Sequence, residues 1–142
     1  MTTSVVALQI DGVWLGIDAD LVLEILGECA WVPLPGVSAS VPGVLGWRGR
    51  AIAVVDLASA TGLSSAVQTA RRRRALVVKF GADTLALPVD EVREVQEIDE
   101  ASVRGSHATR LRYSNGEVDL HGLTLPLLDS QALMASLTRT RD

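Results

Sequence analysis

Few side chains in this 142-residue sequence stand in a pattern that would support enzymatic chemistry. Ser106 and His107 are the residue types of a nucleophile and its base, but adjacent residues rarely point at each other, and no Gly-x-Ser-x-Gly turn accompanies them. Asp56, Asp90 and Asp129 each follow an apolar run, and a pair of them would supply acid–base chemistry. Strand-end or helix-capping positions explain the three aspartates equally well. We therefore expect this protein to have no enzymatic activity.

The sequence is equally poor in groups that bind metals or cofactors. Its two histidines, His107 and His121, lie in different predicted segments with no cysteine nearby, which is more typical of isolated surface histidines than of a metal pair. Cys29 is the single cysteine and is expected to be a small, buried or half-buried residue rather than a nucleophile. No glycine-rich loop carries the lysine and hydroxyl that hold a nucleotide phosphate and magnesium. We expect neither a cofactor nor a metal.

Two charged residues have the character of a binding site. Arg48 occupies a glycine-flanked turn, from which a guanidinium can form a two-pronged pair with a carboxylate. Glu24 lies in a helix-like segment, on a different side from Leu21 and Ile25. One interpretation places Glu24 and Arg48 face to face beside an apolar groove, where they would orient a partner. The other makes them ordinary surface charges that contribute little to stability.

Composition and charge restrict the classes of partner. Seventeen acidic and thirteen basic residues give a net charge of −4 and a pI near 5.1, which leaves no broad basic surface for nucleic acid. The run from Arg71 to Arg74 has the chemistry to bind a phosphate, but we favour a solvated strand entrance. The chain starts without the basic and apolar runs of a secretion signal, and its longest charge-free stretch, 29–47, holds three prolines. We expect a soluble, cytoplasmic protein with no inserted membrane segment.

The elements that must position Glu24 and Arg48 are short. Apolar residues alternate over 6–10 up to Asp11-Gly12, and a second apolar run follows, which predicts a hairpin around a type I′ turn. A second hairpin is predicted over 43–57, around the turn Arg48-Gly49-Arg50.

Helices are expected at two places. Four apolar residues over 21–26 fall at helical spacing, and Asp18 or Asp20 would cap that helix. Leu133, Met134 and Leu137 predict a terminal helix over 129–137 that packs on one unit. The segment 31–42 holds three prolines and is predicted to be an extended loop.

The sequence also repeats itself at an offset of 70 residues. The alternating apolar residues of 6–10 align with those of 76–80, and Val22-Leu23-Glu24-Ile25 aligns with Val92-Arg93-Glu94-Val95. With a slight shift, the segment that begins at Gly49 recurs at Gly122. We infer two similar small β units, most simply two barrels that share an interface and thereby remove their exposed edges.

Six short motifs in a fixed order resemble the CheW family, the adaptors of bacterial chemosensory arrays. No single motif is specific, but their order and spacing together are, and the likeness spans almost the whole chain. The motifs are Val22-Leu23-Glu24-Ile25, Pro33-Leu34-Pro35, Gly43-Val44-Leu45-Gly46-Trp47-Arg48-Gly49, Val54-Val55-Asp56-Leu57, Val89-Asp90-Glu91-Val92 and Leu127-Leu128-Asp129.

The resemblance implies a mainly β fold: two small, intertwined, SH3-like five-stranded β-barrels packed together, with short helices that include a C-terminal one. The chain would be a single CheW-like domain over 1–142, with approximate halves 1–70 and 71–142 and the chain crossing between them. Catalysis is not implied. Family members bridge the cytoplasmic tips of chemoreceptors to the regulatory domain of the histidine kinase CheA, and self-association in array rings is left open.

The resemblance also assigns partner-binding residues. Receptor contact would lie in an apolar groove between the barrels, at Val22, Ile25 and Arg48, with Glu24 pairing to Arg48. The kinase contact uses barrel ends.

Four positions depart from the family pattern. Gly46 stands where Asn is usual, Ala53 where Pro is usual and Ala86 where Gly is usual, and Trp47 is larger than the usual aliphatic residue. These departures suggest a divergent adaptor with altered coupling to its receptor or kinase. An exposed Trp47 would be a partner contact, since tryptophan is enriched at binding hot spots; otherwise it fills the core between the barrels. The alternative function is a generic β-barrel module that binds peptides or proteins outside chemotaxis.

Overall fold

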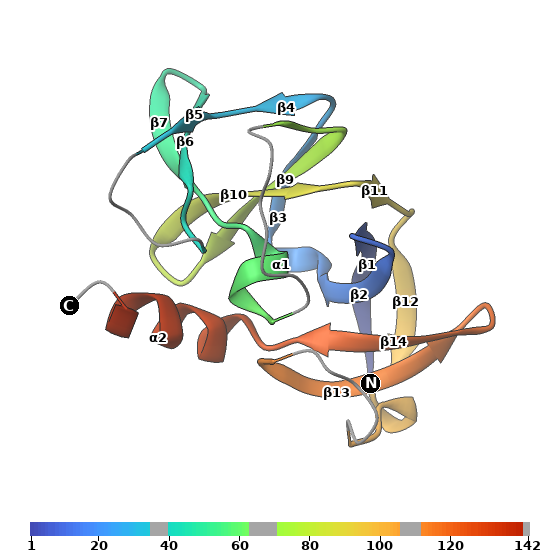
Figure 1. Cartoon of the computed structure of the whole chain (residues 1–142). Coiled ribbons are helices and arrows are strands. Elements are labelled where there is room, and N and C mark those ends of the chain that lie inside the picture. The colour runs from blue at the N-terminus through green and yellow to red at the C-terminus, as the bar shows by residue number, and fades with distance from the viewer. Residues whose placement is uncertain (35–39, 63–70, 106–111, 141–142) are drawn as a thin grey trace.

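The computed structural model describes residues 1–34, 40–62, 71–105 and 112–140, and these form mainly short β-strands (Figure 1). The mainly β prediction is therefore confirmed. The Ser106–His107 pair lies outside the described residues. Within the described ranges, no helix has the length and hydropathy needed to cross a membrane.

The first of two barrels, called barrel 1 below, has five strand positions around its wall. β11 and β12 share one position because both pair with β1, β11 near its end and β12 near its start. Past β12, Arg104 forms an antiparallel bridge with Glu117 of β13, which closes the ring. The strands of barrel 1 are β1 (Thr2–Ile10), β2 (Val13–Asp18), β11 (Glu91–Val92), β12 (Gln96–Asp99), β13 (Ser114–Leu120) and β14 (Leu123–Leu128).

Barrel 2 closes in a similar way. The segment that carries β3, β4 and β5 begins beside β9 and ends beside β6, so a single bent stretch joins the two ends of the sheet. Its strands are β3 (Val22–Leu26), β4 (Cys29–Ala30), β5 (Val32–Pro33), β6 (Gly43–Trp47), β7 (Arg50–Val54), β8 (Arg71–Arg72), β9 (Arg74–Phe80) and β10 (Asp83–Val89).

Each barrel contains strands from both halves of the sequence. β3 follows the hairpin β1–β2 along the chain but pairs with β9, and β11 and β12 follow the hairpin β9–β10 but pair with β1. Two parallel pairings, β10 with β7 and β14 with β2, join the hairpins within each barrel. The barrels are thus intertwined rather than strung in series.

Three hairpins share one turn geometry. In each turn, both central residues have positive φ, as a type I′ turn requires, and the second is a glycine, which adopts this conformation without steric cost. The turns are Asp11-Gly12 (φ 49° and 80°), Arg48-Gly49 (48° and 80°) and His121-Gly122 (48° and 81°). The hairpins predicted around Asp11-Gly12 and Arg48 are confirmed.

The helix predicted over 21–26 is wrong. Asp18 does cap a turn, η1 (Ala19–Leu21), through its side chain, but that turn is a single 3₁₀ turn and strand β3 follows it. β3 pairs with β9 with a bulge between Val22 and Glu24. A bulge adds one residue to a strand, so residues three apart lie on one face, and that spacing imitates a helix.

Apolar residues fill three cores, one inside each barrel and one between them. β1 and β9 are buried on both faces because their alternate residues enter different cores: Val6, Leu8 and Ile10 of β1, like Leu76, Val78 and Phe80 of β9, enter the core between the barrels. Ala75 and Val77 point into barrel 2, and Val5 and Ala7 into barrel 1. The aligned apolar residues of the repeat therefore form the interface that the repeat predicted.

Two α-helices complete the fold. These are α1 (Leu57–Ala60) and α2 (Ser130–Thr140) (Figure 1). α1 contributes Leu57 to the core between the barrels, and α2 contributes Leu133 and Leu137. The predicted C-terminal helix is confirmed.

Candidate functional site

Glu24, Trp47 and Arg48 meet at one end of barrel 2, which we call the mouth of barrel 2. Glu24 Oε1 accepts hydrogen bonds from Arg48 Nη2 at 3.0 Å and from the indole Nε1 of Trp47 at 3.3 Å. The guanidinium of Arg48 also lies over the Trp47 ring, 4.8 Å from its centroid, in a cation–π contact. The sequence analysis offered a pairing of Glu24 with Arg48 as one interpretation, and the fold places the two side chains in contact.

The backbone at Arg48 is itself unusual. Asn, Asp and Gly are the residues that favour the left-handed first position of a type I′ turn, whereas Arg48 has a Cβ and no short polar side chain to compensate it. Its side chain remains 69% exposed even though it is paired with Glu24. An exposed ion pair contributes about 0–1 kcal/mol to stability, so the pairing of Arg48 with Glu24 adds little to the stability of the fold.

Val22 and Ile25 lie on the other face of β3. They stand opposite Val78 and Leu76, which enter the core between the barrels, whereas Glu24 stands opposite Val77, which points into barrel 2. Val22 packs against the core, and Ile25 remains 45% exposed. Of the four residues assigned by resemblance, Val22 and Ile25 therefore lie on one face of β3 and Glu24 on the other. Arg48, with Trp47 beside it, belongs to the hairpin β6–β7 and meets Glu24 from there.

Trp47 is half-buried and packs with Leu45 and Leu26 against the interior of barrel 2. It therefore does not fill the core between the barrels, which was one of the two interpretations of this residue. One side of its ring supports barrel 2, and Arg48 covers part of the rest.

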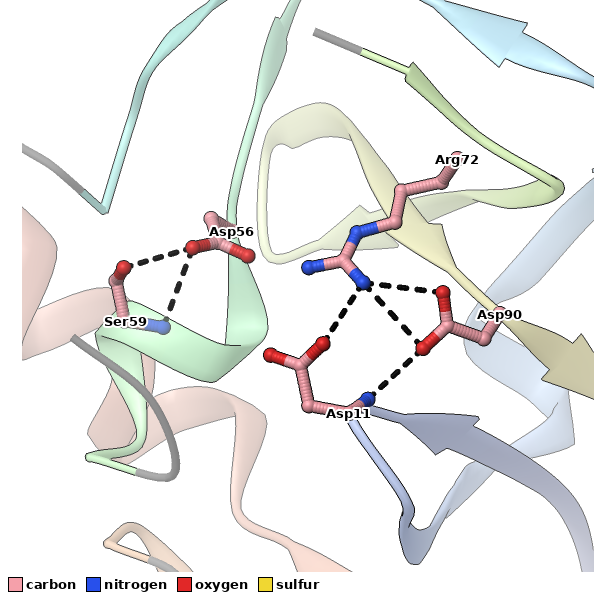
Figure 2. A network of polar contacts seen from close by, with 5 residues as sticks. All are labelled: Asp11, Asp56, Ser59, Arg72 and Asp90. Carbon is pink, nitrogen blue, oxygen red and sulfur yellow. Dashed lines mark hydrogen bonds and ion pairs between the residues drawn. The ribbon is translucent and has the colours of Figure 1, made fainter. Parts of the chain in front are cut away.

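Sequence reasoning missed the role of Arg72. It was expected to belong to a solvated basic run, but its side chain is only 13% exposed. Arg72 Nη1 bonds Asp11 Oδ1 at 2.9 Å and the two carboxylate oxygens of Asp90 at 3.0 and 3.3 Å (Figure 2). Burial lowers the pKa of Arg72, but its hydrogen bonds to Asp11 and Asp90 and their negative charges outweigh this effect, and the net pKa is raised. The cluster joins the first hairpin of barrel 1 to β8 and to the crossing from β10 into β11.

The three aspartates considered as catalytic groups have structural partners. Asp56 accepts from the backbone N–H and the hydroxyl of Ser59 and caps α1 (Figure 2). Asp129 accepts from the backbone N–H of Ala132 in the first turn of α2. Asp90, besides bonding Arg72, accepts from the backbone N–H of Asp11 in the first turn. Asp56 and Asp129 are thus held by the helices that they cap, and Asp90 is held by its contacts with two distant segments.

A second ion-pair cluster lies on barrel 1. Arg104 bonds Glu117 through Nε at 3.2 Å and Asp119 through two nitrogens at 3.0 Å. The hydrogen bonds from Arg104 and Thr124 lower the pKa of Asp119, and Asp119 in turn raises the pKa of Arg104. This cluster sits beside the bridge between Arg104 and Glu117, so it reinforces the closure of barrel 1.

Across the described ranges, no three side chains of the types that ligate metals come together. The fold defines the class: a protein of two intertwined β-barrels that share one core.

The comparisons with known proteins identify the family. The profile of the CheW-like domain matches residues 4–138, which is nearly the whole chain, so the chain belongs to the CheW-like domain family. The fold resembles that of the scaffolding protein TtCheW from Thermoanaerobacter tengcongensis, with a TM-score of 0.77 and 22% identity over 89% of this chain and 84% of that chain. No curated protein matches the sequence. Family membership supports a scaffold or adaptor role in chemotaxis rather than an enzymatic one.

Proposed function

We propose that this chain is a non-catalytic adaptor that couples the cytoplasmic tips of chemoreceptors to the regulatory domain of a CheA-type histidine kinase. The family assignment over residues 4–138 supports the adaptor role. The single observation that carries the receptor contact is the pairing of Glu24 with Arg48, because a strained, exposed arginine in that position has no adequate structural explanation.

The proposed receptor surface is strand β3 and the adjoining mouth of barrel 2. β3 ends the path of paired strands and presents two exposed aliphatic side chains, Leu23 at 46% and Ile25 at 45%. Apolar contact with these residues would supply affinity, and the exposed face of Arg48 would fix orientation by bonding a carboxylate of the receptor. Trp47 holds Arg48 in place from below through the stacked contact, so it contributes to the surface without being fully exposed.

The departures at this mouth support a divergent adaptor. Trp47 adds an aromatic ring where the family pattern has an aliphatic residue, and the indole N–H shares the Glu24 oxygen that binds Arg48. A carboxylate with two donors is less available to an incoming group than one with a single donor. We therefore expect receptor recognition to depend more on Arg48 and on β3 than on Glu24.

The test is co-purification of the tagged protein from its native cells, with partners identified by mass spectrometry. The wild-type chain should recover a chemoreceptor together with a CheA-type kinase. Arg48→Ala should lose most of the receptor while its thermal midpoint stays nearly unchanged, because the ion pair is exposed. Arg50→Ala is the matched control, since Arg50 is an exposed arginine of the same hairpin and should leave receptor recovery intact.

Other results would change the proposal. Recovery of a receptor without a kinase, or the reverse, would indicate a modulatory relative that no longer bridges the two. Recovery of neither would favour the generic binding module. Unfolding of Arg48→Ala would make Arg48 a structural residue.

A further inference from the structure

The mouth of barrel 1 holds a pocket of about 400 Å³, which lies within the usual range for ligand sites. Its floor is apolar and its rim is polar. Ala7, Leu120 and Leu125 line the floor, and Glu94, Gln96 and His121 stand among the rim residues. Nothing in the proposed receptor contact uses this end of the molecule.

The internal repeat relates this pocket to the mouth of barrel 2. Both mouths lie between a type I′ hairpin and the strand segment that crosses from the other barrel. At the offset of 70, Glu94 takes the place of Glu24, and from the Gly49–Gly122 match, Leu120 and His121 take the places of Trp47 and Arg48. His121 shares the left-handed backbone of Arg48 and likewise reaches across its mouth, with Nε2 3.3 Å from Gln96 Oε1.

The difference between the two mouths is what fills them. In barrel 2 the indole of Trp47 lies across the opening, packs on the interior and donates its N–H to Glu24. In barrel 1 the equivalent residue is Leu120, which has a smaller side chain and no donor, and the pocket remains open. Glu94, at the position of Glu24, is exposed and forms no hydrogen bond or ion pair with the described part of the chain.

We propose that the mouth of barrel 1 binds the side chain of a tryptophan presented by a partner protein. The ring would pack on Leu120 and Leu125, and its N–H would be donated to Glu94, which repeats the arrangement of Trp47 in barrel 2. Tryptophan suits such a site because it combines a large apolar face with one polar donor.

None of the three tryptophans in this sequence is available to fill the pocket, because all are engaged elsewhere. Trp47 fills the mouth of barrel 2, Trp31 is buried inside that barrel, and the ring of Trp14 is covered by Arg93, whose guanidinium lies 4.7 Å from its centroid. Arg93 also lines the pocket, so an occupant would disturb the environment of Trp14. Val95 beside the mouth is 54% exposed and offers further apolar contact to the polypeptide that carries the ring.

The first experiment titrates the ¹⁵N-labelled protein with N-acetyl-L-tryptophanamide, which presents an indole with flanking peptide groups. Saturable, millimolar or tighter binding with amide shifts confined to the pocket is expected. Free L-tryptophan is the comparison ligand. Tighter binding of the free amino acid would make a small molecule the occupant and would overturn the assignment to a partner protein.

Variants test the geometry. Leu120→Trp should place its own ring in the pocket as Trp47 does in barrel 2, and probe affinity should fall at least about tenfold in a protein that retains a folded spectrum. Glu94→Ala is on the surface and should not affect folding; it should weaken the probe about 3- to 10-fold through loss of one charged acceptor. A probe methylated at the indole nitrogen should bind Glu94→Ala and the wild type equally.

The proposal is overturned if the probe causes no shifts at the pocket, or if its shifts cluster at β3 instead. It is also overturned if Glu94→Ala weakens the methylated and unmethylated probes alike, because the acceptor role would then be absent. These results bear on barrel 1 alone and leave the receptor contact at barrel 2 to its own test.

Discussion

Replacing Arg72 with methionine should destabilise the protein more than the same replacement of a neighbouring arginine. The substitution keeps most of the side-chain length and removes the charge that bonds Asp11 and Asp90. Arg72 is 13% exposed, while the two carboxylates are 35% and 31% exposed. Two partly buried carboxylates would then stand near each other without a cation.

The magnitude follows from this burial. Removing one partner of a fully buried ion pair costs about 3–5 kcal/mol. Water still reaches about a third of each carboxylate and screens part of that penalty, so we expect a loss of about 2–3 kcal/mol in the free energy of unfolding. In a domain of this size, that loss lowers the thermal midpoint by roughly 6–10 °C.

Urea denaturation at neutral pH measures the effect, with Arg73→Met as the control. Arg73 is exposed in the same basic run, and its loss should change stability by less than about 0.5 kcal/mol. In a background carrying Asp11→Asn and Asp90→Asn, Arg72→Met should cost clearly less, since the charges it compensates are gone. Two results would refute the stabilising role of Arg72: an equal loss of unfolding free energy for Arg72→Met and Arg73→Met, or an undiminished loss for Arg72→Met in the background that carries Asp11→Asn and Asp90→Asn.

Two further predictions concern the core and the pH dependence of stability. Leu133→Ala should lower the free energy of unfolding by about 2–5 kcal/mol, because Leu133 is fully buried between the barrels; Gln131→Ala, exposed on the same helix, should have little effect in the same denaturation assay. Asp119 has its pKa lowered by Arg104 and Thr124, so its contribution is complete at neutral pH and is lost as the pH falls through that lowered pKa. The stability difference between wild type and Asp119→Asn should therefore shrink in acid, and a difference that is constant with pH would contradict this reasoning.

Local signals in the sequence predicted the hairpins well. An Asp-Gly pair between alternating apolar runs specifies a turn through the backbone preferences of two residues, so no distant information is needed. The segment Val22–Leu26 shows the limit of such signals. Its bulge places Val22 and Ile25 on one face at a separation of three, and only the pairing with β9 distinguishes that from a helical turn.

Only part of the candidate site could be predicted, because strand pairing is not visible in the local sequence. Glu24 and Arg48 could be selected by type and position, and the resemblance paired them, but the division of Val22 and Ile25 from that pair depends on the register with β9. Arg72 was missed because its partner Asp11 lies 61 residues away in the chain. A run of four arginines gives no indication of which member is buried.

The exchange of strands between the barrels has a consequence for synthesis on the ribosome. The hairpin β1–β2 is complete by Asp18, yet its partners in barrel 1 end only at Leu128. At ordinary translation rates the hairpin waits about 5–20 seconds for them, with apolar residues uncovered on both faces of β1. Barrel 2 can close once β10 has emerged, but the nascent chain carries an unprotected, aggregation-prone edge until nearly the last strand is made. Holdase chaperones are expected to bind the nascent chain during this interval, and the yield of folded protein should depend on the chaperone concentration.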